Sequence, residues 1–132
     1  MIFTNIVPRV SETDGVGHIN NVFIPIWFEA GRRDIFRIFS PNLDFVNWKL
    51  ALVKVTVEYV DQLYLAENVE VRTGIQKIGN SSFTIREELF QTNRLCAKGE
   101  AIYVNYNFQE NKSEAISNEI RDKLQIIKFV DK

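Results

Sequence analysis

The spacing of the apolar residues changes part-way along the chain, from the period of a helix to the period of a strand. Between Ile24 and Phe39 the large apolar side chains recur every three or four residues, which predicts one long amphipathic helix ending near Ser40. From Val53 onward apolar and polar residues alternate, which predicts strands. The chain must therefore bury one helical stripe against an antiparallel sheet, which is an α+β arrangement.

Four alternating stretches are separated by short polar or glycine-containing turns, and together they predict an antiparallel meander. They lie around Val53–Tyr59, Val69–Ile78, Ser82–Phe90 and Leu95–Phe108. A further strand near Phe3 to Val10 is expected to join the sheet, and Ser117 is expected to cap a short closing helix.

Two positions in these elements carry specific expectations about packing. Gly31 lies in the middle of the predicted helix, where glycine costs about 1 kcal/mol relative to alanine, so a sheet is expected to approach it closely. Cys96 lies in an alternating apolar strand and is expected in the core. The opposite, solvent-facing side of the helix is expected to hold its charged residues, which are Glu29, Arg32, Arg33, Asp34 and Arg37.

Length and charge limit the classes of function. A chain of 132 residues predicts a single domain spanning residues 1–132, and a net charge of −1 with scattered basic residues argues against a nucleic-acid partner. No apolar run approaches the roughly 20 residues of a membrane span. The single cysteine excludes an intrachain disulfide, and the start of the sequence lacks a signal-peptide core, so we expect a cytoplasmic protein.

The densest group of chemically capable residues is the segment "ETDGVGHINN", Glu12 to Asn21, immediately before the long helix. The first amides of a helix lack intrahelical partners and stabilise a developing oxyanion. Gly15 and Gly17 allow a tight turn and a close approach of backbone to a ligand. Asp14 is a candidate general base or nucleophile.

Each of these residues also has a purely structural interpretation. Asp14 would open a turn, and Asn20 or Asn21 would cap the helix. His18, the only histidine, would be a hydrogen-bonded structural residue as readily as a catalytic one, and no second ligand stands at metal-binding spacing. The residue types alone leave these alternatives open.

The segment "RVSETDGVGHINNVFIPIWFEAGRRDIF" resembles the opening signature of the hotdog-fold thioesterases, particularly the 4-hydroxybenzoyl-CoA thioesterase-like group. The resemblance continues through "LVKVTVEYVDQLYLAENVEVRTGIQKIGNSSFTIREELF" and "LCAKGEAIYVNYNF" and so covers nearly the whole chain. It implies a hotdog fold, with a long central helix wrapped by an antiparallel sheet of about five strands. It also implies a homodimer or homotetramer with active sites at the subunit interface.

The resemblance further implies an acyl-CoA thioesterase that releases free CoA and a carboxylic acid. No separate cofactor or metal is expected, since CoA is part of the substrate. Asp14 matches the family's catalytic carboxylate, with Glu12 and Thr13 before it in the triplet. His18, Asn20 and Asn21 are expected to assist catalysis. The residues expected to bind the substrate are Gly17, Val22, Phe23, Gly79, Ser81 and Ser82, with the acyl carbonyl at the helix start and the pantetheine arm at the serines.

Three other functions remain open at this point. The first is hydrolysis of thioesters of acyl carrier protein. Relatives with that activity commonly have a polar residue two positions before the histidine, and Val16 at this position argues against it. A non-catalytic acyl-thioester-binding protein would not need the acid. A dehydratase or isomerase would change an enoyl or hydroxyacyl thioester without releasing a thiol. Asp14 would act on the thioester either through water or by forming an acyl anhydride.

Overall fold

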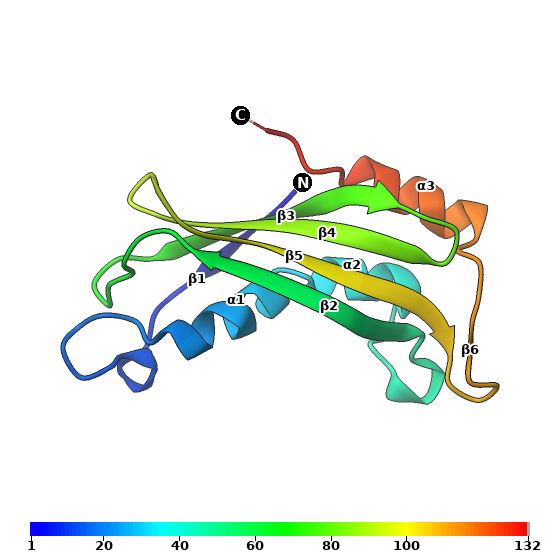
Figure 1. Ribbon diagram of the computed structural model, residues 1–132, viewed down its shortest axis with the longest axis horizontal. Coiled ribbons are helices and arrows are strands. Elements are labelled where there is room, and N and C mark those ends of the chain that lie inside the picture. Colours follow the sequence, from blue (N-terminus) through cyan, green and yellow to red (C-terminus); the bar gives the residue numbers. More distant parts are fainter. Residues whose placement is uncertain (132) are drawn as a thin grey trace.

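The computed structural model describes residues 1–131, which form one curved antiparallel sheet with two short helices lying across its inner face (Figure 1). The elements are β1 Ile2–Ile6, η1 Val10–Glu12, η2 Asn21–Phe23, α1 Ile24–Ala30, α2 Arg33–Phe39, η3 Phe45–Asn47, β2 Leu50–Tyr59, β3 Val69–Ile78, β4 Ser82–Gln91, β5 Arg94–Asn107, β6 Lys112–Ser113 and α3 Asn118–Ile126.

The sheet has the strand order β1-β3-β4-β5-β2, and β6 pairs with the end of β5. The predicted meander is confirmed for β3, β4 and β5. β2, by contrast, pairs with β5 and lies at the far edge of the sheet, not beside β3. Alternation identifies a strand but contains no information about its neighbour, so this long-range pairing was not predictable from the pattern.

The predicted long helix is two helices, α1 and α2, interrupted at Gly31 and Arg32. The close approach expected at Gly31 is confirmed. A Cβ there would lie 2.6 Å from Thr73 Oγ1 and 2.9 Å from Val71 Cγ1, both on β3. Glycine is therefore required at this position by contact with the sheet.

Arg32 does not lie on the solvent-facing side of the helix as expected. Its side chain is buried beneath the sheet, where the guanidinium donates two hydrogen bonds to the carboxylate of Glu87 and one, of 3.1 Å, to the hydroxyl of Tyr103. Position 32 is four residues after Phe28 and three before Ile35, both fully buried, so the helical spacing itself places Arg32 on the buried side. A buried guanidinium is tolerated there because Glu87 pairs with it. The other four residues predicted on the charged side are exposed, as expected: Glu29, Arg33, Asp34 and Arg37.

The expectations for Cys96, Ser117 and the first strand are confirmed with small differences. Cys96 is buried in the core, and Ser117 caps α3 by accepting a hydrogen bond from the Ile120 amide at 3.2 Å. The first strand ends at Ile6, before Pro8, which has no N–H to donate to a ladder. None of the helices found among residues 1–131 is long and apolar enough to cross a bilayer.

Candidate functional site

The glycine-rich segment forms a small hairpin beyond the end of the sheet. Thr13 and Ile19 form an antiparallel bridge, and the Asp14 amide donates to the His18 carbonyl at 2.9 Å. Gly15 and Gly17 have φ angles of +91° and +89°, which L-residues with a Cβ rarely adopt. A Cβ at either position would meet no described atom within 4 Å, so the backbone angle and not crowding requires glycine.

Asp14 lies at the exposed tip of this hairpin. Its Oδ1 accepts a hydrogen bond from the Val16 amide at 3.1 Å, so the turn-forming role considered for it is present in the structure. Its Oδ2 makes no hydrogen bond to any described residue, and no cation among them pairs with the carboxylate. One oxygen thus orients the side chain, and the other is available to a ligand.

His18 is half-buried and held by ring packing. Its imidazole meets the ring of Tyr64 edge-on, with centroids 5.1 Å apart, and the two residues form an isolated β-bridge. Neither ring nitrogen is hydrogen-bonded to any group in residues 1–131. The hydrogen-bonded structural histidine considered from the sequence is therefore not what the structure contains.

Asn20 caps the start of the helical segment. Its Oδ1 accepts from the Val22 amide at 3.1 Å, and its carbonyl accepts from the Phe23 amide at 3.0 Å. The Asn21 amide has no partner among the described residues. At the start of the helix, where the acyl carbonyl is expected, the amides of Val22 and Phe23 are thus already bonded to Asn20. The Asn21 N–H is the free donor at this turn.

Glu12 fixes the hairpin to the helix, a role that the sequence did not reveal. Its carboxylate is 1% exposed and accepts hydrogen bonds from the Arg9 amide, the Arg9 guanidinium and Trp27 Nε1, at 2.7, 3.0 and 2.9 Å. Burial acts to raise the pKa of Glu12, but these hydrogen bonds outweigh it and hold the pKa below its usual value. In the sequence, Glu12 and Asp14 are two acids of one polar segment, and nothing in that pattern indicates that Glu12 is buried.

The second predicted group, Gly79, Ser81 and Ser82, forms the turn between β3 and β4. The Gly79 amide donates to the Ser82 carbonyl at 2.7 Å, and the Ser81 carbonyl accepts from the Asn105 amide at 2.7 Å. Both serines are half-buried. The turn is therefore well ordered by backbone hydrogen bonds.

These two predicted groups lie at opposite ends of the sheet. Gln91, at the end of β4, exchanges hydrogen bonds of 2.9 and 2.7 Å with the backbone of Tyr64, the neighbour of His18. Ser82 begins the same strand, and ten residues of strand span about 30 Å at roughly 3.3 Å per residue. Within one chain, Asp14 and the serine turn cannot contact the same thioester.

An open groove of about 510 Å³ lies at the serine-turn end of the sheet, before the start of β2 and at the end of β5. Its apolar lining includes Phe45 and Val46, which are 81% and 79% exposed, together with Trp48 and Phe108. The rest of the lining is largely polar and includes Asn47, Lys49 and Glu114, so the groove offers both apolar and polar side chains to a ligand. Among residues 1–131 no cluster of His, Cys, Asp and Glu has the geometry to hold a metal ion.

The comparison with family models gives a match over residues 8–124, to the thioesterase-like superfamily. The chain belongs to this superfamily. A predicted thioesterase from Bacillus stearothermophilus is 49% identical and superposes with a TM-score of 0.95, over 99% of this chain and 98% of that one. The predicted hotdog fold, α+β with a curled antiparallel sheet of about five strands, is confirmed. The comparison with curated proteins finds none that matches.

More distant solved structures share the fold. One is a thioesterase from Thermus thermophilus complexed with coenzyme A and Zn, at 20% identity and a TM-score of 0.83, over 94% of this chain and 97% of that one. Another is the Staphylococcus aureus protein SAV2348 in complex with CoA, at 12% identity and a TM-score of 0.85, over 99% and 87% of the two chains. At these identities the likeness concerns the fold.

Proposed function

We propose that this thioesterase-like protein hydrolyses acyl-CoA thioesters, with Asp14 as the acting carboxylate. The observation that carries the proposal is the surroundings of Asp14, which has one oxygen fixed by the turn and the other free, on a hairpin held to α1 by Glu12. Superfamily membership supports thioester hydrolysis. The CoA complexes of two fold relatives support CoA as the thiol carrier.

In the proposed mechanism the thioester carbonyl accepts a hydrogen bond from the free Asn21 amide, which stabilises negative charge on the oxygen as the carbonyl is attacked. Asp14 either removes a proton from the attacking water or itself attacks to form an anhydride that water then opens. His18 packs beside the hairpin with both ring nitrogens free, and we assign it and Asn20 helper roles. CoA thiolate is the leaving group.

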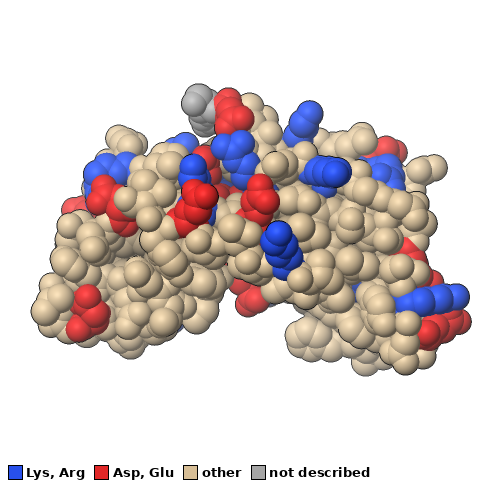
Figure 2. Space-filling view, viewed as in Figure 1, with Lys and Arg blue, Asp and Glu red and all other residues tan. Residues whose placement is uncertain are grey.

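A second copy of the chain is needed to complete this site. β2 is a ten-residue edge strand, and no described residue pairs with its outer edge. Leu52, Val53, Val55 and Tyr59 on it are 40–57% exposed. In Figure 2 charged side chains gather over the upper half of the molecule. The lower half, where β2 lies between residues 10–23 and 41–49, is largely uncharged and its outline is indented.

The side chains of β2 complement a second β2 in one antiparallel register. When the pairing is centred on Thr56, Lys54 lies opposite Glu58 of the partner subunit, twice by symmetry, and Val55 lies opposite Val57 of the partner subunit. A centre on Lys54 or on Glu58 would place like charges opposite each other. We therefore propose a homodimer joined through β2.

This dimer joins the two halves of the site. Antiparallel pairing brings the Tyr59 end of one β2, beside the Asp14 hairpin, to the Leu50 end of the other. Tyr59 donates to the Asn21 carbonyl at 3.4 Å, and Leu50 pairs with Asn105, next to the serine turn. Asp14 of one subunit then acts on a thioester whose pantetheine arm follows Gly79–Ser82 of the partner subunit, with the acyl group against the apolar side chains of the groove that contains Phe45 and Val46.

The test is release of free thiol from a panel of acyl-CoA esters, with Asp14→Asn as the decisive variant. Asparagine retains the size of aspartate and its hydrogen bond in the turn but can neither accept a proton nor form the anhydride, so kcat should fall by at least about 100-fold. Circular dichroism and light scattering must show the variant folded and assembled. A kcat near that of the parent would assign Asp14 to the turn alone.

The alternatives give different results in the same assay. A binding protein releases no thiol from any ester, and a dehydratase or isomerase changes the absorbance of an enoyl or hydroxyacyl thioester without releasing thiol. Preference for an acyl carrier protein would appear as a higher kcat/KM for the carrier-linked ester. Single turnover in ¹⁸O-labelled water followed by mass spectrometry tests the anhydride route, because ¹⁸O enters Asp14 only when water attacks the aspartyl carbonyl of an anhydride. The cytoplasmic location remains a prediction.

A further inference from the structure

A basic groove lies beside the serine turn, between the second half of β3 and α3. It has a volume of about 420 Å³ and is lined by Ile75, Gln76, Lys77, Ile78, Arg121, Gln125 and Lys128. Three of these residues are cations, and no Asp or Glu is among the described residues that line it. This concentration is unusual in a chain whose net charge is −1.

The three cations are available to a ligand. Lys77 and Lys128 are exposed, and none of the three takes part in an ion pair within residues 1–131. Arg121 is positioned by hydrogen bonds from its Nη2 to the carbonyls of Gly79 and Asn80, at 3.0 and 3.5 Å, which tie it directly to the serine turn. The N–H groups on its Nη1 and Nε make no hydrogen bond to a described residue.

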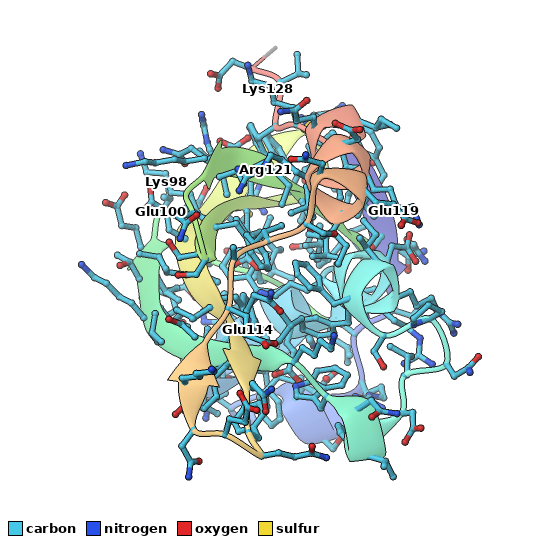
Figure 3. All side chains as sticks on the ribbon, turned by 90° about the vertical axis from the view of Figure 1, so that its right-hand side faces the viewer. Lys98, Glu100, Glu114, Glu119, Arg121 and Lys128 are labelled. Carbon is cyan, nitrogen blue, oxygen red and sulfur yellow. The ribbon has the colours of Figure 1, made fainter. Side chains whose placement is uncertain are left out.

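Neither Glu119 nor Asp131 neutralises the groove. Figure 3 views the end of the molecule that carries Arg121 and Lys128, and Glu119 lies on the other side of α3 from Arg121. Glu119 pairs instead with Lys123, at 3.5 Å. Asp131 pairs with Arg86, at 2.8 Å. Unpaired cations that flank a groove attract phosphate groups.

Taking the proposed function as its basis, we infer that this groove binds the phosphates of the nucleotide end of coenzyme A. The position fits the length of the ligand. The reacting thioester lies at the β2 edge, and the strand order β2-β5-β4-β3 places the groove three strand spacings away, about 14 Å. A pantetheine arm that runs past the Gly79–Ser82 turn covers such a span and delivers the phosphates to Lys77, Arg121 and Lys128.

The experiment compares acyl-CoA with the corresponding acyl-pantetheine, which has the same thioester but no nucleotide. In the double variant Lys77→Ala/Lys128→Ala, the KM for acyl-CoA should rise roughly tenfold, because two charge-assisted phosphate contacts are lost. The kcat, and all constants for acyl-pantetheine, should stay at the parent values. In the parent protein, the KM for acyl-CoA should be lower than the KM for acyl-pantetheine, and this difference should shrink with added salt.

The matched control is Lys123→Ala, which removes a cation of α3 that lies outside the groove and should leave the constants for both substrates unchanged. An unchanged KM for acyl-CoA in the double variant, or an equal rise for both substrates, would overturn the inference. A rise confined to an ester of acyl carrier protein would overturn it too, since the groove would then bind an acidic protein. Calorimetric titration with CoA and with pantetheine tests the groove separately if no thioester is hydrolysed.

Discussion

Glu12 and Asp14 are two residues apart and have opposite surroundings. Glu12 is buried and receives three hydrogen bonds, whereas Asp14 is exposed and keeps one oxygen free. A carboxylate that is buried away from water and whose charge is stabilised by three donors is a poor proton acceptor. These contacts agree with the proposed division of roles, in which Glu12 holds the hairpin against Trp27 and Asp14 is the carboxylate left free to act.

Replacement of Glu12 by glutamine should therefore destabilise the fold in a pH-dependent way. The amide places an NH₂ group against N–H donors, and losing hydrogen bonds to a charged group costs about 1.5–3 kcal/mol in the free energy of unfolding at pH 7. Because the folded pKa of Glu12 is lowered, its stabilisation is present above the unfolded value near 4.5 and is lost as the pH falls through the folded pKa.

Urea unfolding of the parent and Glu12→Gln at pH 7 and pH 3 measures this effect. The difference between them should shrink at the lower pH. Glu119→Gln, an exposed change on α3, should alter the free energy of unfolding by less than about 0.5 kcal/mol at either pH. A pH-independent difference for Glu12→Gln would contradict the role given to its charge.

At the scale of residues the sequence predicted the tight turn before the helix but not the contacts within it. Gly15 and Gly17 mark a tight turn because few other residues adopt their backbone angles, so the hairpin itself was predictable. The burial of Glu12 depends on Trp27, fifteen residues away, and the local residue pattern does not indicate that contact. The free Asn21 amide was not predictable either, because it depends on Asn20 accepting from the amides of Val22 and Phe23 and not from that of Asn21.

At the scale of elements, the pair α1 and α2 carries the hairpin on one side and packs on β3 on the other. The contact that fixes this packing is Gly31 against Thr73 and Val71. The sequence predicted the close approach, because glycine destabilises a helix and is retained where a larger side chain does not fit. It did not predict the interruption after Gly31, because the apolar spacing of the two helices remains close to that of one.

Gly31→Ala tests whether the sheet contact outweighs helix propensity. On an open helix this change would stabilise by about 1 kcal/mol, but here the added methyl lies 2.6 Å from Thr73 Oγ1 and should destabilise by about 1–3 kcal/mol. In a Thr73→Ala background part of the loss should be recovered, since the nearest atom is gone. Denaturant unfolding of the four proteins gives the coupling, and a stabilising Gly31→Ala would refute the contact.

At the scale of the whole molecule, the two groups of candidate site residues are far apart in one chain. The structure places the Asp14 hairpin and the serine turn at opposite ends of ten-residue strands, about 30 Å apart. The resemblance to hotdog thioesterases implied both groups from the sequence, but only the sheet order shows that one chain cannot unite them. In the proposed dimer, antiparallel pairing of two β2 strands removes this separation, because each hairpin meets the other subunit's turn.

Defined heterodimers test this arrangement through the charge pairs of β2. Chains carrying Lys54→Glu have only acidic side chains at the two positions, and chains carrying Glu58→Lys have only basic ones. Each variant alone places like charges opposite each other and should dimerise weakly, whereas a mixture should form heterodimers with two complementary pairs. Light scattering and native mass spectrometry measure the assembly. A parent protein that is active as a strict monomer would remove the interfacial site.

Within these heterodimers, Asp14→Asn and the groove change Lys77→Ala/Lys128→Ala are placed either on different chains or on the same chain. If each site joins Asp14 of one subunit to the groove of the other, separate chains leave one fully intact site, with the parent KM for acyl-CoA. Placing both changes on one chain instead leaves the surviving Asp14 facing an altered groove, so the KM should rise roughly tenfold. A site confined to one subunit predicts the reverse assignment. The two arrangements contain identical substitutions, so loss of stability or of charge cannot produce the difference between them.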